Sequence, residues 1–347
     1  MQKSDVELVR GILFALFVAY FGPQIIFKYS HRIRSFLLFM NRFGRTDKNL
    51  SKLVDGNGNN FGLKRVRSLR LRHSDEAIEI GVWHILPESR LAFGCNDDDD
   101  EEGAEQKQME PFDDQRPIVF YVHGNKGTRA GEHRLKLYRR LAYEFDFHVI
   151  AFDFRGFGDS TDTGPTSKGV TCDTQLVYNW LLEQPNVHPD RVFVWAHSLG
   201  TGLAIKVISD LPECSKPSGL ILEAPFDSIA NAIANHPFSR PFKLVPKLFE
   251  HFIVDPIERS NDELNSLKHL PGLKSTRVII LHAEDDPIIP LRLGKNLYEK
   301  AAEEIGKDRV DFVQISAQFN LGHRYICDHN ETMARVERFI NQARELV

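Results

Sequence analysis

Five short runs of apolar residues, rich in β-branched and aromatic side chains, recur along the chain. They occupy residues 118–123, 148–154, 191–196, 219–223 and 277–282. These runs lack the polar alternation of a half-exposed strand, so they suit strands buried on both faces of a parallel sheet. Helical segments separate or follow them, at residues 133–143, 171–183, 199–210 and 291–304. Alternating strands and helices predict an α/β fold with a mostly parallel central sheet and helices on both faces.

Segments on either side of this region extend the predicted sheet. Residues 63–72 and 77–86 predict two earlier strands, and residues 313–315 predict a last strand before a helix at 331–347. The chain has 347 residues, of which 42% are hydrophobic, and this suffices for one large domain. We therefore assign residues 62–347 to a single α/β domain.

The N-terminus carries an apolar stretch at residues 8–27, and its part from 11 to 22 has no charged residue. Twenty helical residues span roughly 30 Å, about the thickness of the hydrocarbon layer of a membrane. Residues 1–28 are therefore predicted to form a membrane anchor helix. A helix lying in the membrane interface, a buried core helix and a cleaved signal peptide are the alternatives.

Residues 29–61 are expected to form a juxtamembrane segment and a linker. Residues 31–45 mix basic and apolar side chains, which suits either a membrane surface or packing on the domain, and residues 48–60 are polar and rich in Gly and Asn. A second polar segment, the acidic insertion at 96–114, cannot bury enough apolar surface to order itself.

The overall composition argues against several classes of partner. The formal net charge of −4 gives no reason to expect nucleic acid. The four cysteines are scattered without a CxxC motif, so neither a disulfide framework nor a zinc site is expected.

The sharpest local motif is WAHSLGTG at residues 195–202. It places Ser198 between the strand that ends at Ala196 and the helix that opens at Leu199. A serine on such a tight turn, flanked by small residues, is typical of a nucleophile elbow. Ala196 replaces the first glycine of the usual G-x-S-x-G pattern. An ordinary helix N-cap is the alternative for Ser198.

A second motif, VHGNKG at residues 122–127, follows the first buried strand. Glycines there allow backbone N–H groups to turn toward a ligand. In folds with a nucleophile elbow, the oxyanion hole uses one backbone N–H from this loop and one from the residue after the serine. We assign these donors to Asn125 and Leu199, with a plain strand-ending turn as the alternative for the loop.

An acid and a base follow in the chain order that this arrangement requires. Three acids, Glu284, Asp285 and Asp286, come just after the strand at 277–282. Asp286 is our choice, because the loop then closes with an apolar pair and a proline. His323, presented by the flexible Gly322, would take the proton of Ser198 while Asp286 holds the imidazole. His329 is the rival base; neither a cofactor nor a metal is required.

Residues 226–275 lie between two predicted strands and are expected to form a short lid over the elbow. This lid region is rich in large apolar side chains: Phe226, Phe238, Phe242, Leu244, Leu248, Phe249, Phe252 and Ile253. An apolar lid favours an acyl chain, although the same side chains could instead anchor helices to the core.

With these motifs in place, the chain resembles the α/β-hydrolase domain-containing protein 12 family from about residue 80 to the C-terminus. The resemblance rests on GVWHILP, YVHGNKGTRAGEHR, FDFRGFGDS, HSLGTG, LILEAPF, HPFS, LHAEDDPIIP and LGHRYI. It implies an α/β-hydrolase fold and places the family's nucleophile, acid and base on Ser198, Asp286 and His323. Ala196 and a shorter loop before His323 depart from the family pattern.

The same resemblance implies an integral-membrane lipase of the endoplasmic reticulum, with a lumenal catalytic domain and with lysophosphatidylserine and monoacylglycerols as substrates. Basic residues that follow the apolar stretch predict the opposite side, the cytoplasm. Sequons at Asn49 and Asn330 would be usable only in the lumen.

We therefore expect a serine hydrolase that cleaves such lipid esters through an acyl-enzyme. A catalytically inactive membrane scaffold, and an acyl-thioesterase or peptidase, are the alternatives.

Overall fold

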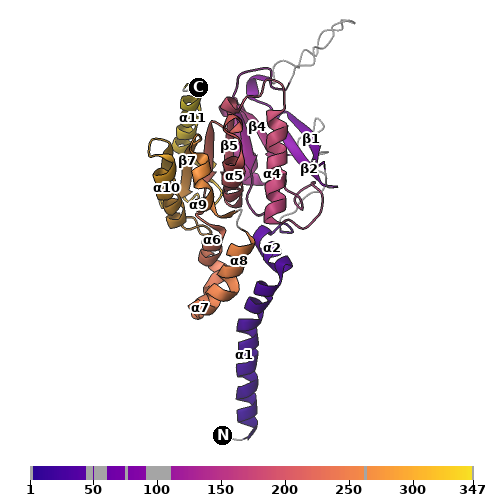
Figure 1. The fold of residues 1–347 in the computed structure, drawn as a ribbon, viewed down its shortest axis with the longest axis vertical. Coiled ribbons are helices and arrows are strands. Elements are labelled where there is room, and N and C mark those ends of the chain that lie inside the picture. The colour runs from indigo at the N-terminus through magenta and orange to yellow at the C-terminus, as the bar shows by residue number, and fades with distance from the viewer. Residues whose placement is uncertain are drawn as a thin grey trace.

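The structure, a computed structural model, describes residues 3–43, 50, 61–74, 77–90, 111–261 and 264–345. Its centre is one sheet of eight strands in the order β1-β2-β4-β3-β5-β6-β7-β8 (Figure 1). The strands are β1 (Val66–Arg72), β2 (Glu79–Ile85), β3 (Ile118–Val122), β4 (His148–Phe152), β5 (Val192–His197), β6 (Gly219–Glu223), β7 (Arg277–Ala283) and β8 (Val310–Ile315).

Strands β3 to β8 pair in parallel, whereas β2 pairs antiparallel with both β1 and β4. The predicted mostly parallel sheet is confirmed, and the predicted strand ends differ from the observed ones by a few residues at most. Every residue of β3, β4, β5 and β6 is buried, as expected for strands covered on both faces.

Helices cover both faces of the sheet, as predicted. The main ones are α3 (Glu132–Arg139), α4 (Ser167–Leu182), α5 (Leu199–Asp210), α10 (Leu291–Ile305) and α11 (Asn330–Glu345). Side chains of α4, α5 and α10 share a core with Phe120 of β3, while those of α3 and α11 share a second core with its neighbour Tyr121. Successive strand residues thus point into opposite layers.

The N-terminal helix α1 (Lys3–Tyr29) projects away from the domain (Figure 1). Only 6% of its most apolar window is buried, so the alternative of a buried core helix is wrong. Among the described residues, α1 is the one helix that is long and apolar enough to cross a membrane. The chain then turns into α2 (His31–Phe39), whose Leu38 and Phe39 are buried in the domain core. Of the two alternatives for this segment, packing on the domain is therefore the one observed.

The expected lid region is a chain of short helices. These are α6 (Ile229–Asn235), η6 (Pro237–Leu244), α7 (Pro246–Phe249), η7 (Glu250–Val254), α8 (Asp255–Ser260), α9 (Ser266–His269) and η9 (Leu270–Leu273). Figure 1 shows α6, α7 and α8 at the end of the domain from which α1 emerges. Phe226, Phe249 and Ile253 are buried in the core, but Phe238 and Leu244 are exposed. Some large apolar side chains of the lid region therefore anchor its helices to the core, as one of the two alternatives expects, and others are exposed.

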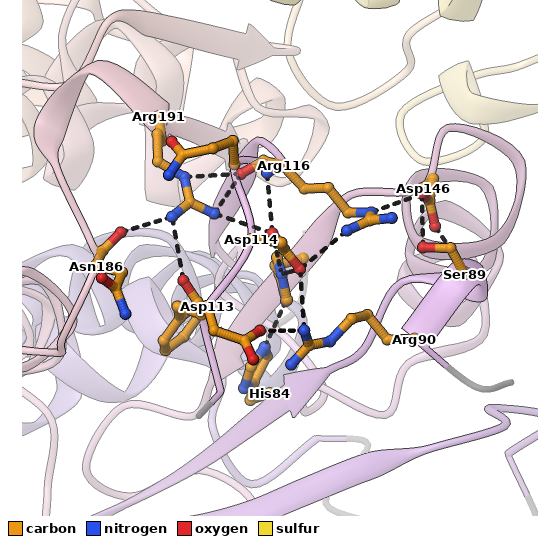
Figure 2. A network of polar contacts seen from close by, with 12 residues as sticks. His84, Ser89, Arg90, Asp113, Asp114, Arg116, Asp146, Asn186 and Arg191 are labelled. Carbon is orange, nitrogen blue, oxygen red and sulfur yellow. Dashed lines mark hydrogen bonds and ion pairs between the residues drawn. The ribbon is translucent and has the colours of Figure 1, made fainter. Parts of the chain in front are cut away.

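The acidic run at 97–102, the linker at 48–60 except Leu50, and the sequon at Asn49 lie outside the described residues. The structure corrects the prediction that the acidic insertion is unable to order itself up to residue 114. Phe112 is buried, and Asp114 lies within a polar network at the amino ends of β3, β4 and β5 (Figure 2). Three arginines, Arg90, Arg116 and Arg191, and His148 attract the carboxylates there, so this end of the insertion is part of the packed domain.

Candidate active site

Ser198 lies at the carboxyl end of the central strand β5, directly before α5. Its backbone has φ 52° and ψ −119°, a conformation that is costly for a residue with a Cβ atom. Its side chain makes no capping hydrogen bond to α5, so the N-cap alternative is wrong. The strained turn instead aims the hydroxyl above the edge of the sheet.

Small residues around Ser198 allow this turn to form. A Cβ atom on Gly200 would lie 2.3 Å from the carbonyl oxygen of Val122, so any larger residue would push α5 away from β3. Ala196 is fully buried and keeps its place in the ladder opposite Val122 and Leu222. The elbow therefore tolerates alanine where glycine is usual.

The structure brings the three predicted side chains together. His323 Nε2 lies 2.9 Å from Ser198 Oγ, and His323 Nδ1 lies 2.7 Å from Asp286 Oδ2. Both distances are within hydrogen-bond range. The hydroxyl of Ser198 can thus donate to Nε2, while the Nδ1–H of His323 donates to Asp286 and fixes the ring tautomer.

Asp286 is held as an ionised carboxylate. Its Oδ1 accepts hydrogen bonds from the backbone N–H groups of Ile288 and Ile289, at 2.8 and 2.9 Å. Burial raises the pKa of Asp286, but the hydrogen bond and charge of His323 and the backbone donors outweigh burial and lower the pKa below its ordinary value.

The two competing acids have separate partners. Asp285 Oδ2 accepts from the backbone N–H of Gly322 at 2.9 Å, and Glu284 Oε2 accepts from that of Ala317 at 3.0 Å. Both contacts pin the loop that carries His323. Asp285 and Glu284 therefore anchor this loop, and Glu284 does so from an exposed position. The rival base His329 instead bonds the hydroxyl of Thr332 at 2.8 Å.

The loop after β3 passes close to the elbow. A Cβ atom on Gly124 would lie 3.3 Å from the Cβ of Ser198, which places Asn125 beside the nucleophile. Leu199 is the first residue of α5, so its N–H is among those with no carbonyl partner inside the helix. These positions suit the two oxyanion donors that the sequence predicts.

The side chain of Asn125 reveals a connection that the sequence did not predict. Its Nδ2–H donates to the carbonyl oxygen of Leu38 in α2 at 3.1 Å. The helix that follows α1 is thus bonded directly to the candidate oxyanion loop.

The sequence assigns no role to two further polar residues beside the elbow. His197 Nε2–H donates to the carbonyl oxygen of His323 at 2.8 Å, and burial lowers the pKa of His197, which keeps its ring neutral. Glu223 accepts from Trp195 Nε1–H at 2.8 Å, and burial raises its pKa to about 8. Their only signal in the sequence is their position, next to the serine and at the end of the neighbouring strand.

Known proteins share these features. A sequence profile of the serine aminopeptidase S33 family matches residues 113–271. Lysophosphatidylserine lipase ABHD12 of Bos taurus is 34% identical over 99% of this chain and 82% of its own length. The Xenopus tropicalis protein of the same name is 37% identical over 76% and 68%. Protein ABHD12B of Homo sapiens is 34% identical over 77% and 71%.

Solved structures share the fold at lower sequence identity. An alpha-beta hydrolase from Vibrio vulnificus superposes with a TM-score of 0.62 at 18% identity, over 90% of this chain and 92% of its own. The Pyrococcus furiosus esterase PF2001 gives 0.57 at 16% identity, over 83% and 94%. Together with the relatives that cover most of both sequences, these matches establish that the chain is an α/β-hydrolase and belongs to the ABHD12 family.

Proposed function

We propose that this protein is a serine hydrolase that cleaves the acyl ester bond of lysophospholipids, lysophosphatidylserine among them, and of monoacylglycerols. The observation that carries the proposal is the continuous hydrogen-bonded line from Ser198 through His323 to Asp286. Relatives with 34% identity over nearly the whole chain, named as lysophosphatidylserine lipases, support the substrate class.

The proposed reaction is acyl transfer through a covalent intermediate. His323 Nε2 takes the proton of Ser198 as Oγ attacks the ester carbonyl carbon, and the ionised Asp286 stabilises the imidazolium that forms. The backbone N–H groups of Asn125 and Leu199 would hold the oxyanion, where one lost donor costs about 10²–10³ in rate. His323 then protonates the leaving alcohol, and water, activated by the same histidine, releases the fatty acid.

The lid supports a substrate with an acyl chain. The exposed side chains of Phe238 and Leu244 lie on the segment of the lid that contacts α1. A peptidase is the second candidate, because the S33 profile covers the elbow and most of the lid.

The decisive experiment compares purified wild-type protein with Ser198→Ala on lysophospholipids, monoacylglycerols, acyl-thioesters and aminopeptidase substrates. We expect ester cleavage by the wild type and a loss of about 10⁶-fold in kcat for the variant. Equal rates in both proteins would defeat the assignment of Ser198, and no cleavage by the folded wild type would leave an inactive scaffold as the better description. Cleavage of peptides in preference to esters would favour the second candidate.

We further propose that α1 anchors the protein in the endoplasmic reticulum membrane as a single span. The family resemblance favours a lumenal domain, whereas the basic residues after α1 favour the cytoplasm. Asn330 is exposed at the start of α11, so its sequon is accessible. A mobility shift on glycosidase treatment that Asn330→Gln abolishes would support the lumen, and digestion of the domain by protease added to sealed microsomes would support the cytoplasm.

A further inference from the structure

The lid is attached to the middle of the candidate membrane span. The hydroxyl of Tyr20 in α1 donates to the carbonyl oxygen of Phe242 at 3.0 Å and accepts from the N–H of Val245 at 3.3 Å. The rings of Tyr20 and Phe242 also face each other, with centroids 6.5 Å apart. These contacts fix the depth of the lid relative to α1.

The charges of α1 determine where the hydrocarbon layer can lie along it. The helix has 27 residues and is about 40 Å long, longer than the roughly 30 Å layer. A layer that ended at Tyr20 would extend over Asp5, Glu7 and Arg10, which are costly at that depth. A layer that ends near Phe27 leaves Asp5 and Glu7 outside and puts Arg10 within reach of the opposite interface.

Tyr20 then lies inside the hydrocarbon layer. It precedes Phe27 by about two helical turns, or roughly 10 Å along the helix axis. Because Phe242 and Val245 are bonded to Tyr20, the lid must reach the same depth. We propose that residues 238–248, which we name the lid tip, insert into the membrane beside α1. The inference rests on the proposed membrane anchor and is independent of the catalytic assignment.

The surface of the lid tip fits this environment. Phe238, Leu244 and Val245 are 75%, 78% and 41% exposed, although they are large apolar residues. The lid tip also carries three exposed basic residues and no acid, at Arg240, Lys243 and Lys247. Long basic side chains among apolar ones are typical of segments that lie in an anionic membrane interface, because their charged ends reach the headgroups.

A cavity lined mainly by charged and polar residues lies where the headgroups would be. It has a volume of about 230 Å³ and is lined by the end of α1, the start of α2 and the helices that follow the lid tip: Lys28, Tyr29, Arg34, His251, Asp255, Pro256, Arg259 and Ser260. Lys28 Nζ also donates to His251 Nε2 at 2.5 Å. The cavity lies beside the end of α1, near Phe27, at the level that the charges of α1 give for the membrane boundary.

The lid tip also leads to the catalytic centre. His236 comes directly before η6, and its pKa is lowered by burial and then by the nearby His323. The short segment from His236 to the lid tip therefore connects the neighbourhood of the candidate base, His323, with the part of the lid that we propose to lie in the membrane.

Fluorescence quenching in vesicles of pure lipid tests this insertion. Full-length Leu244→Trp would be reconstituted into phosphatidylcholine–phosphatidylserine vesicles with acyl chains brominated near the headgroup end. Gln342→Trp, on the exposed surface of α11 at the other end of the molecule, is the matched control (Figure 1). The emission of the wild type, with its three native tryptophans, is subtracted from both.

We expect brominated lipid to remove at least half of the added emission at position 244 and almost none at position 342. Equal quenching at the two positions would overturn the proposal. Because no other protein is present, quenching at position 244 can come only from lipid, and a lid tip that binds a partner protein instead would stay unquenched. The measurement needs no substrate, so it gives the same answer even if the proposed hydrolysis fails.

A rate ratio provides the functional counterpart. Leu244→Asp should lower hydrolysis of a long-chain lysophospholipid in vesicles, relative to a water-soluble butyrate ester, at least tenfold, while Gln342→Asp should leave that ratio unchanged. An unchanged ratio for Leu244→Asp would contradict the proposal, whether both rates persist or both fall together.

Discussion

Two hydrogen-bonded lines of similar composition lie at opposite edges of the sheet. At the carboxyl edge, Asp286 accepts from His323, which faces Ser198. At the amino edge, Asp114 accepts from His148 Nε2–H at 3.1 Å, and His148 Nδ1 lies 2.9 Å from Nε2 of His84 (Figure 2). Both lines join a carboxylate to an imidazole and then to a third polar group.

The two lines differ in their third polar group and in the surroundings of that group. His84 is fully buried and stacks on Phe112 with ring centroids 4.5 Å apart, so no substrate can reach it. Burial, followed by the charge of His148, lowers the pKa of His84 and keeps it neutral. Ser198 instead lies on a strained turn beside the first N–H of a helix. A carboxylate–imidazole pair becomes catalytic only where the fold adds an accessible nucleophile and free donors.

Removal of the carboxylate at the carboxyl edge should have the largest effect. Asp286→Asn keeps the shape of the side chain but stabilises the wrong tautomer of His323, so kcat should fall about 10⁴-fold. Steady-state kinetics on a lysophospholipid would measure this loss, and an unchanged melting temperature would show that the fold is intact. A loss of less than tenfold would remove Asp286 from the proposed mechanism.

The same substitution at the amino edge should affect stability and leave catalysis intact. Asp114 contacts Arg116 and Arg191 at 3.1 and 3.2 Å, and although burial raises its pKa, hydrogen bonds from His148 and Arg116 lower it below the ordinary value. Asp114→Asn leaves buried cations without their partner, so the free energy of unfolding should drop by about 3 kcal/mol. Denaturant titration measures this drop; a large fall in kcat of the folded variant would erase the contrast between the two edges.

The bond between α2 and the oxyanion loop should have a smaller effect. Asn125→Ala keeps the backbone N–H but frees the loop from Leu38, so kcat should fall about tenfold, less than for a lost donor. Asn41→Ala is the matched control, because Asn41 Nδ2–H makes an equivalent bond to the carbonyl oxygen of Gly156. Equal losses of kcat in the two variants would mean that the effect comes from looser packing of the N-terminal segment.

The smallest predicted effect concerns pH. The folded-state pKa of Glu223, about 8, exceeds its ordinary value of 4.5, so the folded protein holds a proton that the unfolded chain releases between these pH values. The contribution of Glu223 to stability is therefore complete below about pH 4.5 and is lost as the pH rises through about 8. Glu223→Gln cannot ionise but still accepts from Trp195. Between pH 5 and 9 its melting temperature should fall about 3–6 °C less than that of the wild type, and parallel curves would contradict the assignment.

The sequence predicts the sheet well because its strands are buried on both faces and read as continuous apolar runs. The three candidate catalytic residues were also predicted, since each follows a strand whose carboxyl end lies at the same edge. The antiparallel pairing of β2 with β4 could not be predicted, because periodicity reports which faces are buried and not which strands are neighbours.

Contacts between distant segments account for the other surprises. The roles of Asp285 and Glu284 depend on where the loop of His323 passes, some 30 to 40 residues later in the chain. The bonds of Tyr20 to the lid and of Asn125 to α2 join segments separated by 222 and 87 residues. No local pattern encodes such pairs, and they become visible only when the chain is folded.

Labelling with a fluorophosphonate probe, followed by mass spectrometry of the modified peptide, tests the central claim most directly. The hydroxyl at position 198 should be the site of covalent attachment in the folded wild type, and labelling should disappear in Ser198→Ala and slow sharply in Asp286→Asn. A folded wild-type protein that stays unlabelled, or carries the probe on another residue, would contradict the account.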